Sequence, residues 1–311
     1  MISRGSSGNG NNLIPFEVEA KTIDLNDWTL FGEGGVAKTY IGKSDPAVVL
    51  KLNNESYEAQ IAYGEFIQSK NVCSTGIPCP QFYDFVTDGS RYGYTSQRIM
   101  GKKSYSRLLA DNPSKIGELA AQFAARTREL HAVKCDTSLF PALLDVYKSF
   151  IDSSEVFPDD VRALLQSYYD ERDTAAASCL HGDLQMGNLI NASGKDYWID
   201  LGSFGYGDPL GDLATMTLIA DYFPSKHIEE VFHNSRRRFR RFNELFLKAY
   251  FGGEPGPEIR AKINRLALLK AGVCVAFKPE NAWYFYPAIR GRKLLFSILR
   301  LFSRFLPVRV S

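Results

Sequence analysis

Three polar side chains within residues 179–214 have the types and the spacing that phosphoryl transfer requires. Asp183 is followed five positions later by Asn188, and Asp200 comes directly after a short apolar stretch. Such a transfer needs Mg²⁺ across the phosphates and a carboxylate near the attacking hydroxyl. Because Mg²⁺ takes oxygen ligands and keeps several waters, one carboxylate and one amide are a sufficient protein contribution. Asn188 and Asp200 fit that work, which leaves Asp183 to accept the hydroxyl proton.

The spacing of these residues favours catalysis over a simpler interpretation. Asp and Asn are common in turns, so any one of the three could be a turn or capping residue. The D-x-x-x-x-N interval from Asp183 to Asn188 equals that of the protein-kinase catalytic loop. Strand-like runs lie beside Asn188 and before Asp200, so a β-hairpin can bring the two side chains together. All three residues together, with strands between them, indicate a catalytic site.

A glycine-rich turn near the N-terminus has the composition of a phosphate-binding loop. Gly32, Gly34 and Gly35 lie between predicted strands, where backbone N–H groups can approach phosphate oxygens closely. The kinase pattern G-x-G-x-x-G would place its third glycine at Ala37, so the match is incomplete. Lys51 ends the strand-like run VVLK and would pair with the α- and β-phosphates.

The helix expected at about residues 55–70 offers two carboxylates that could orient the lysine. Glu58 and Glu65 are seven positions apart and therefore share a helix face. In the same kinase interpretation, the adenine is expected to meet the backbone from Gln97 to Ile99.

Residues 32–39 also allow a different interpretation. The run GEGGVAKT is one residue away from a Walker A loop, in which Lys38 would hold the phosphates and Thr39 the metal. Ala37 stands where that motif has glycine, and the residues after Thr39 resemble a strand, whereas a P-loop opens a helix. A P-loop NTPase using Lys38 is therefore the less favoured alternative.

The predicted elements change in character near residue 100. The first hundred residues are β-rich with one helix, and helices are expected at 104–133, at 142–178 and from about 210 to the end. We therefore expect an α+β, bilobal, protein-kinase-like fold with a small β-rich N-lobe and a larger, mainly helical C-lobe. The expected parts are a disordered tail at 1–12, a nucleotide-binding N-lobe at 13–100, and a catalytic and acceptor-binding C-lobe at 101–311.

The motifs HGDLQMGN and IDLGSFGYGDPLGDLA, at residues 181–214, resemble the aminoglycoside phosphotransferase and choline-kinase-like family, which has the protein-kinase-like fold. The resemblance covers about residues 30–215. It implies ATP (with GTP left open), Mg²⁺ and a small hydroxylated acceptor, with Asp183 as base and Asn188 and Asp200 as metal ligands. It further implies that Asp212 braces the catalytic loop.

The resemblance also favours Glu65 over Glu58 as the partner of Lys51, because of its distance to the following Pro-containing strand. His181 is expected to fix the loop by hydrogen bonding, since Asp183 already supplies the base. Gln185 and Met186 replace the His-Pro that is more frequent in the family, and this removes no required ligand.

Charge is distributed unevenly along the chain. Residues 226–311 carry 18 Lys/Arg against 6 Asp/Glu, whereas the net charge of the chain is +2. A basic C-terminal third does not suit cationic aminoglycosides, so we expect a neutral or anionic acceptor, such as a sugar or glycan hydroxyl. The run RRRFRR at 236–241 could equally be a solvated helix face.

Five cysteines without C-x-x-C spacing argue against a disulfide framework, and a cytoplasmic location is expected. No nucleic-acid partner is expected. The sequence of residues 290–311 predicts an amphipathic helix that either packs on the C-lobe or makes weak contact with a membrane surface. A catalytically silent nucleotide-binding scaffold of the same fold is the remaining alternative, although no base or ligand is missing.

Overall fold

The computed structural model describes residues 19–33, 36–303 and 308. The predicted disordered tail at 1–12 and two of the predicted phosphate-loop glycines, Gly34 and Gly35, lie outside the described residues. The chain divides into two units, one built from Met1–Lys102 with Ala192–Gly202 and the other from Lys103–Asn191 with Ser203–Ser311. Residues 192–202, and with them Asp200, therefore belong to the first unit, although the sequence suggests the range 101–311 for the C-terminal part.

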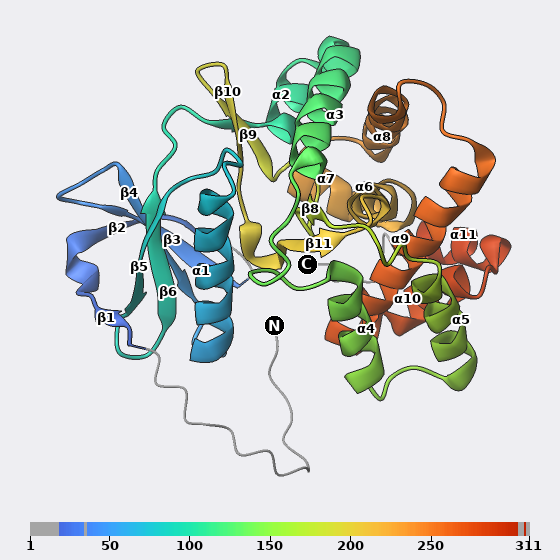
Figure 1. The fold of residues 1–311 in the computed structure, drawn as a ribbon, viewed down its shortest axis with the longest axis horizontal. Coiled ribbons are helices and arrows are strands. Elements are labelled where there is room, and N and C mark those ends of the chain that lie inside the picture. The colour runs from blue at the N-terminus through green and yellow to red at the C-terminus, as the bar shows by residue number, and fades with distance from the viewer. Residues whose placement is uncertain (1–18, 34–35, 304–307, 309–311) are drawn as a thin grey trace. The chain divides into compact units, whose positions relative to one another are not determined.

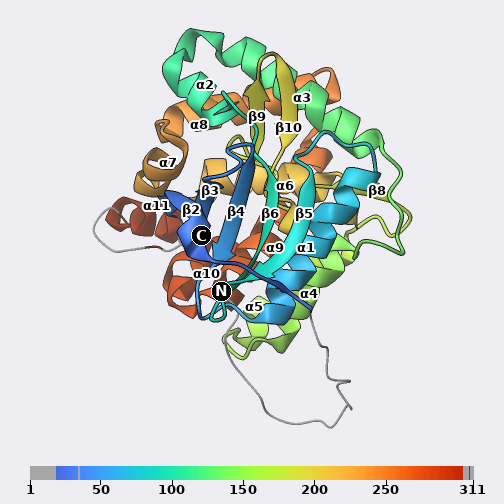
Figure 2. The same ribbon diagram turned by 90° about the vertical axis from the view of Figure 1, so that its left-hand side faces the viewer.

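The first unit is a six-stranded sheet with one helix on it (Figure 1 and Figure 2). The strand order is β1-β5-β6-β4-β3-β2, and β1 is parallel to β5 while the other neighbours are antiparallel. The strands are β1 (Lys21–Thr22), β2 (Trp28–Glu33), β3 (Ala37–Gly42), β4 (Val48–Asn53), β5 (Phe82–Thr87) and β6 (Tyr92–Gln97).

Helix α1 (Ala59–Ser74) packs on β5 and β6. Its buried side chains Ala62, Phe66 and Ser69 recur at helical spacing, and Phe66 joins Phe85 and Tyr94 in a core cluster. The helix begins four residues later than expected, because Glu58 has an extended backbone and is its N-cap.

The structure argues against the P-loop alternative. Residues 37–42 form strand β3, in which Lys38 pairs with Leu52 and Thr39 with Lys51 across the sheet. Lys38 Nζ also lies 3.0 Å from a carboxylate oxygen of Glu33. A P-loop lysine sits at the N-terminus of a helix, and no helix begins here.

The second unit is mainly helical. Its helices are α2 (Tyr105–Asp111), α3 (Ile116–Ala132), α4 (Leu143–Ser153), α5 (Asp159–Asp170), α6 (Leu210–Tyr222), α7 (Ser225–Phe232), α8 (Arg236–Phe251), α9 (Pro257–Phe277), α10 (Ala282–Ile289) and α11 (Lys293–Phe302). Its short strands form two antiparallel pairs, β7 (Lys103–Ser104) with β9 (Leu189–Ala192) and β8 (Ser178–Leu180) with β11 (Gly205–Gly207).

Two of the expected helices are interrupted at prolines. The helix expected at 104–133 is two helices, α2 and α3, separated by a short turn that begins at Pro113. The helix expected at 142–178 is α4 and α5, with Pro158 as the N-cap of the second, and it gives way to strand β8. Proline lacks the N–H that an interior helix position needs, so it is favoured at the start of a helix and disfavoured in its interior.

Helix α6 lies at the centre of the second unit, where it packs against α8 and α9. Every residue from Gly211 to Ala220 is buried, so α6 is covered on all sides. Helix α3 packs against α8 through the ring of Phe123, whose centroid lies 5.8 Å from that of Phe242 and 5.2 Å from that of Phe246. This core supports the start of α6, which carries Asp212.

None of the described helices is both long enough and apolar enough to pass through a lipid bilayer.

Candidate active site

In the first unit, Lys51 and Asp200 form an ion pair. Lys51 Nζ on β4 lies 3.5 Å from Asp200 Oδ1. The segment that carries Asp200 is attached to this unit through β10 (Lys195–Trp198), whose Trp198 N–H donates to the Pro78 carbonyl at 2.9 Å. Burial opposes the charge on Lys51, but Tyr94, Asp200 and Glu65 outweigh it and hold the pKa of Lys51 above its usual range. Lys51 is therefore a permanent cation.

Asp200 has an uncommon backbone conformation. Its φ is +60°, in the left-handed region that non-glycine residues seldom adopt. Two residues later, a Cβ on Gly202 would lie 3.1 Å from Cγ of Glu65, so the backbone here runs close against α1. The strained conformation is thus held in place by packing within the same unit.

Of the two candidate glutamates, Glu65 is the one near Lys51. The Tyr57 hydroxyl donates a hydrogen bond to the Glu65 carboxylate, and the charge of Glu65 contributes to the raised pKa of Lys51. Glu58 is instead the N-cap residue of α1. The ion pair that Lys51 forms is with Asp200, so Glu65 influences the lysine at longer range.

The remaining nucleotide-site predictions fall at the ends of strands. Gly32 lies in β2, and a Cβ added there would meet nothing within 4 Å, so packing does not require a glycine. Gln97 ends β6, and its N–H donates to the Gln81 carbonyl at 2.8 Å. Gln97 could therefore offer an adenine its carbonyl oxygen but not its N–H, while Ile99 follows it as a buried residue.

In the second unit, Asp183 and Asn188 lie in one loop between β8 and β9 and contact each other. The amide nitrogen of Asn188 donates to the carbonyl oxygen of Asp183 at 2.9 Å and to its carboxylate at 3.1 Å. The Asn188 amide oxygen thereby remains as the group that can bind a cation. The Asp183 side chain is 42% exposed, so its carboxylate is open to solvent.

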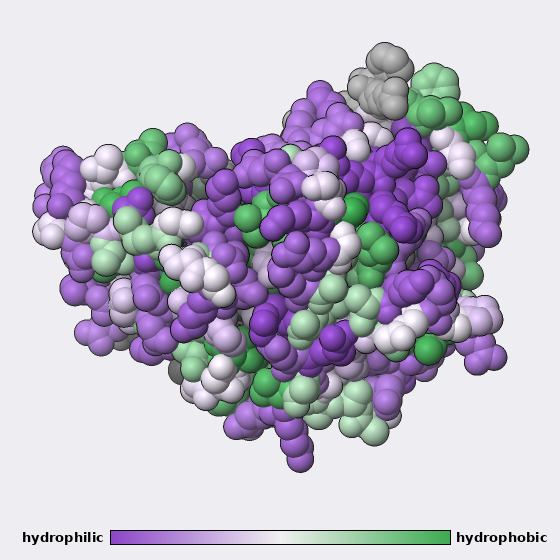
Figure 3. Space-filling view, turned by 90° about the horizontal axis from the view of Figure 1, so that it is seen from above, coloured by the Kyte–Doolittle hydropathy of each residue, from purple (hydrophilic) through white to green (hydrophobic). Residues whose placement is uncertain are grey.

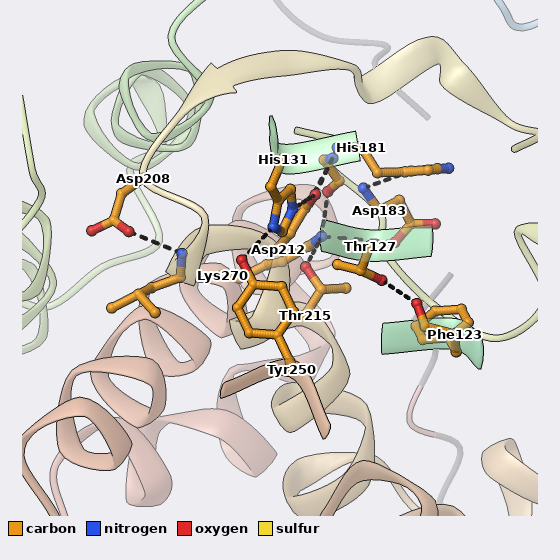
Figure 4. A network of polar contacts seen from close by, with 12 residues as sticks. Phe123, Thr127, His131, His181, Asp183, Asp208, Asp212, Thr215, Tyr250 and Lys270 are labelled. Atoms are coloured by element: carbon orange, nitrogen blue, oxygen red, sulfur yellow. Dashed lines mark hydrogen bonds and ion pairs between the residues drawn. The ribbon is translucent and has the colours of Figure 1, made fainter. Parts of the chain in front are cut away.

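Asp212 holds the start of this loop from beneath (Figure 4). Its buried carboxylate accepts hydrogen bonds from the N–H groups of His181 at 2.7 Å and Gly182 at 2.9 Å. Its third partner is Nε2 of His131 at 3.1 Å, and Nδ1 of that ring lies 2.8 Å from the Tyr250 hydroxyl. One carboxylate therefore joins α3, α6 and the catalytic loop, and α8 is reached through Tyr250.

The structure explains the residue types at the two positions before Asp183. Gly182 has φ +78°, and a Cβ there would lie 1.8 Å from the Ser203 carbonyl oxygen, so only glycine fits. His181 is fully buried, and its Nδ1 lies 3.3 Å from the Asp183 N–H. His181 thus faces the loop and not the exposed side, where the Asp183 carboxylate lies.

A lysine that the sequence analysis did not single out lies next to Asp183. Lys270 Nζ, on α9, donates to the Gly182 carbonyl at 2.6 Å and to the Thr215 hydroxyl at 2.8 Å. It is also 3.7 Å from Asp183 Oδ1. Burial lowers the pKa of Lys270, but Tyr147 and Asp183 outweigh it and raise the pKa on balance. In the sequence, Lys270 could have been recognised as a candidate because it is the lone charged residue in the apolar run LALLKAGVCVAF.

Replacing Asp212 with asparagine is expected to destabilise the fold by about 3 kcal/mol at neutral pH. Asparagine has one acceptor oxygen where the carboxylate has two, so its NH₂ would face the N–H of His181 or Gly182. Urea unfolding measures the change, and Asp159→Asn, at an exposed position in the first turn of α5, is the matched control. A loss no larger than that of the control would contradict the bracing role.

The cost of this substitution is also expected to depend on pH. Burial alone would raise the pKa of Asp212, but His131 and the N–H of His181 hold it below its usual value. A carboxylate with a lowered pKa stabilises the fold above its unfolded pKa of about 3.9 and loses that stabilisation as pH falls through the folded value. The stabilisation that the Asp212 carboxylate itself contributes should therefore be fully present above about pH 5 and be lost in more acidic solution, where the difference between wild type and Asp212→Asn shrinks.

These two groups of residues have the types found in phosphoryl transfer, namely a cation, carboxylates and an amide oxygen. A sequence model described as the phosphotransferase enzyme family matches residues 27–260.

The chain belongs to the phosphotransferase enzyme family.

Solved structures of this kind share its fold. A choline/ethanolamine kinase family protein from Mesorhizobium loti is 14% identical, with a TM-score of 0.53 over 90% of this chain and 88% of that one. Aminoglycoside phosphotransferase APH(3'')-Id from Streptomyces rimosus is 19% identical, with a TM-score of 0.53 over 78% and 92%. Aminoglycoside phosphotransferase APH(4)-Ia is 15% identical, with a TM-score of 0.55 over 88% and 90%. No curated protein matches the chain.

The expected α+β, protein-kinase-like fold and the resemblance to aminoglycoside phosphotransferases and choline kinases are thus confirmed. At these sequence identities, the solved structures show only that the fold is shared. They do not identify the acceptor of this phosphotransferase or the roles of its residues.

Proposed function

We propose that this phosphotransferase moves the γ-phosphoryl group of Mg²⁺-bound ATP onto a hydroxyl of a small molecule, with Asp183 as the catalytic base. The observation that carries the proposal is the Asp183 carboxylate itself. It is partly exposed, held by the Asn188 amide, and placed on a loop whose start is fixed by the buried Asp212.

Asp183 would accept the hydroxyl proton as the acceptor oxygen bonds to the γ-phosphorus, and the bond from that phosphorus to the bridging oxygen would break to release ADP. A carboxylate beside a polyphosphate faces charge repulsion, and Lys270, 3.7 Å away, supplies a compensating cation. Lys270 also holds the Gly182 carbonyl, so it positions the residue that precedes the base. We therefore assign Lys270 as a positioning residue and Asp183 as the catalytic one.

Lys51 is proposed to bind the phosphates, because its charge is permanent and phosphate oxygens are anionic. Asp200 and Asn188 are proposed to ligate Mg²⁺, which neutralises phosphate charge when bound. Their donor atoms fit, since one is a carboxylate and the other an amide whose NH₂ is engaged by Asp183. Among the described residues, no group of three or more His, Cys, Asp and Glu could hold a metal ion.

ATP is proposed as the donor, on the support that a solved APH(4)-Ia variant is a ternary complex with AMP-PNP and hygromycin B. Glu65 is proposed to support Lys51, and the Gln97 carbonyl and the Ile99 backbone to meet the adenine. Gly32, with Gly34 and Gly35, is proposed to cover the phosphates.

The acceptor is proposed to be a neutral or anionic sugar or glycan hydroxyl, although the APH(3'')-Id and APH(4)-Ia complexes contain streptomycin and hygromycin B. The charge balance of residues 226–311 supports this proposal. The run RRRFRR adds little to it, because Arg236 donates to backbone carbonyls, Arg240 pairs with Asp221 and Arg241 pairs with Glu244. These arginines belong to the surface structure of α8.

The test of the proposed function is ATP consumption against a panel of hydroxyl compounds that includes neutral sugars, anionic glycans, amino alcohols and kanamycin-like aminoglycosides. Wild-type protein should consume ATP with at least one acceptor, and Asp183→Ala should not. Failure of Mg²⁺-ATP to raise the thermal unfolding temperature would contradict the proposal. Turnover confined to aminoglycosides would contradict the acceptor class alone.

A further inference from the structure

Helix α11 presents its apolar side to the solvent. Leu294 and Leu301 are 77% and 65% exposed, and Leu295, Ile298 and Phe302 are exposed as well. The helix carries five of the thirteen exposed large hydrophobic side chains among the described residues, so the exposure is concentrated on it and not scattered. In Figure 3 hydrophobic surface gathers at the right-hand edge of the view.

The opposite side of α11 attaches the helix to the rest of the second unit. Phe296 is buried, and its ring centroid lies 5.5 Å from that of Tyr222 and 5.3 Å from that of Tyr284. Arg300 donates to the Asp221 carbonyl at 3.3 Å. The helix is therefore docked through one large aromatic side chain and a charged one, and most of its leucines point away from the core.

The exposed residues form a single stripe. Leu294, Ile298, Leu301 and Phe302 stand at positions i, i+4, i+7 and i+8, which lie on one side of a helix. A surface helix normally turns such a stripe towards the core. The stripe contains no hydrogen-bonding side chain. It therefore suits the apolar part of a lipid bilayer better than a protein partner that would be aligned by hydrogen bonds.

Positive charge accompanies the stripe. The sequence after Glu280 contains no Asp or Glu but six basic residues, namely Arg290, Arg292, Lys293, Arg300, Arg304 and Arg309. Arg292 and Lys293 are exposed at the start of α11. An apolar stripe bordered by cations matches the surface of an anionic bilayer, where acyl chains lie beneath negative head groups.

We propose that α11 docks the protein on an anionic lipid bilayer, with its leucine stripe inserted at the level of the head groups and Arg292 and Lys293 bound to lipid phosphates. The helix has ten residues and is about 15 Å long at 1.5 Å per residue, which is half the thickness of the hydrocarbon core. It therefore lies in the plane of the membrane. This inference stands apart from the kinase chemistry and makes the protein a peripheral one.

Vesicle flotation of the full chain tests the proposal, with phosphatidylglycerol vesicles against phosphatidylcholine vesicles. Wild type should float with the anionic vesicles, and Leu294→Gln/Leu301→Gln should lower the partition coefficient about 100-fold, tenfold for each side chain withdrawn from lipid. Arg292→Gln/Lys293→Gln should lower it about tenfold, and high salt should mimic that loss. Leu139→Gln/Ile259→Gln, which changes two exposed apolar residues elsewhere in the second unit, is the matched control and should float as wild type does.

Two results would overturn the proposal. The first is a wild-type chain that does not float with anionic vesicles. If light scattering then shows a dimer that Leu294→Gln/Leu301→Gln converts to a monomer, a second copy of the chain, and not lipid, covers the stripe. The other is equal loss of flotation in the control variant. Thermal unfolding temperatures close to that of wild type establish that each variant is folded.

Discussion

Asp183→Asn is expected to lower kcat for phosphoryl transfer by about 10³-fold while changing the affinity for ATP by less than about threefold. The substitution keeps the size of the side chain and leaves the hydrogen bond from Asn188 to the residue-183 carbonyl in place. What it removes is the ability to accept the hydroxyl proton. Initial rates of ADP formation with an accepted substrate, together with calorimetric ATP binding, measure the two effects separately.

A matched substitution distinguishes loss of the base from a general loss of charge. Asp173 is an exposed aspartate of the same unit, so Asp173→Asn should leave kcat unchanged. If Asp183→Asn keeps more than a tenth of the wild-type kcat, the base is another residue. A thermal unfolding temperature close to that of wild type establishes that the variant is folded.

Lys270→Met is expected to lower kcat by about 100-fold with little change in the KM for ATP. Methionine fills a similar volume in α9 but can neither hold the Gly182 carbonyl nor compensate the charge of Asp183. The Tyr147 hydroxyl still donates to that carbonyl at 3.0 Å, so the loop retains one anchor. The split between kcat and KM separates this positioning role from a purely structural one, which would lower both binding and turnover.

Lys262 provides the control for this substitution. It lies on the same helix, two turns earlier, and its Nζ pairs with Asp208 at 2.8 Å. Lys262→Met should therefore leave kcat close to wild type. If Lys270 acts through Asp183, then Lys270→Met combined with Asp183→Asn should cost no more than Asp183→Asn alone; full additivity of the two losses would contradict that link.

The shape of the catalytic loop could be predicted from the sequence because its requirements are local. The interval from Asp183 to Asn188 is five residues, and the two side chains do contact each other. A short interval of this kind leaves a readable pattern in residue types. The bracing contacts of Asp212 instead reach N–H groups 30 and 31 positions away, and that role was expected from the family resemblance.

What escaped the sequence analysis depends on contacts between distant segments. Lys270 is 87 positions from Asp183, and its place beside the loop follows from the packing of α9 against α6. His131 and Tyr250 reach Asp212 from α3 and α8 in the same way. The breaks at Pro113 and Pro158 were readable in principle, since proline starts a helix more readily than it continues one.

The residues proposed to bind the nucleotide were predictable in part, because some follow from local patterns and others from contacts between distant segments. Lys51 in β4 was predicted from its strand pattern, and Glu65 from the family resemblance and its distance to the next strand. The direct ion pair of Lys51 with Asp200 joins residues 149 positions apart, which only the return of residues 192–202 to the first unit brings together. The roles of these residues in binding ATP stay a prediction.

The proposed mechanism requires both Asn188 and Asp200 as ligands of Mg²⁺ on bound ATP. Calorimetric titration of Asn188→Ala, Asp200→Ala and the double variant with ATP, with and without Mg²⁺, measures this directly. We expect each single variant to weaken Mg²⁺-ATP binding by about tenfold, to leave metal-free ATP binding unchanged, and to combine with a loss smaller than the product of the two. An Asn188→Ala variant that binds Mg²⁺-ATP as tightly as wild type does would contradict the proposal that Asn188 is a metal ligand.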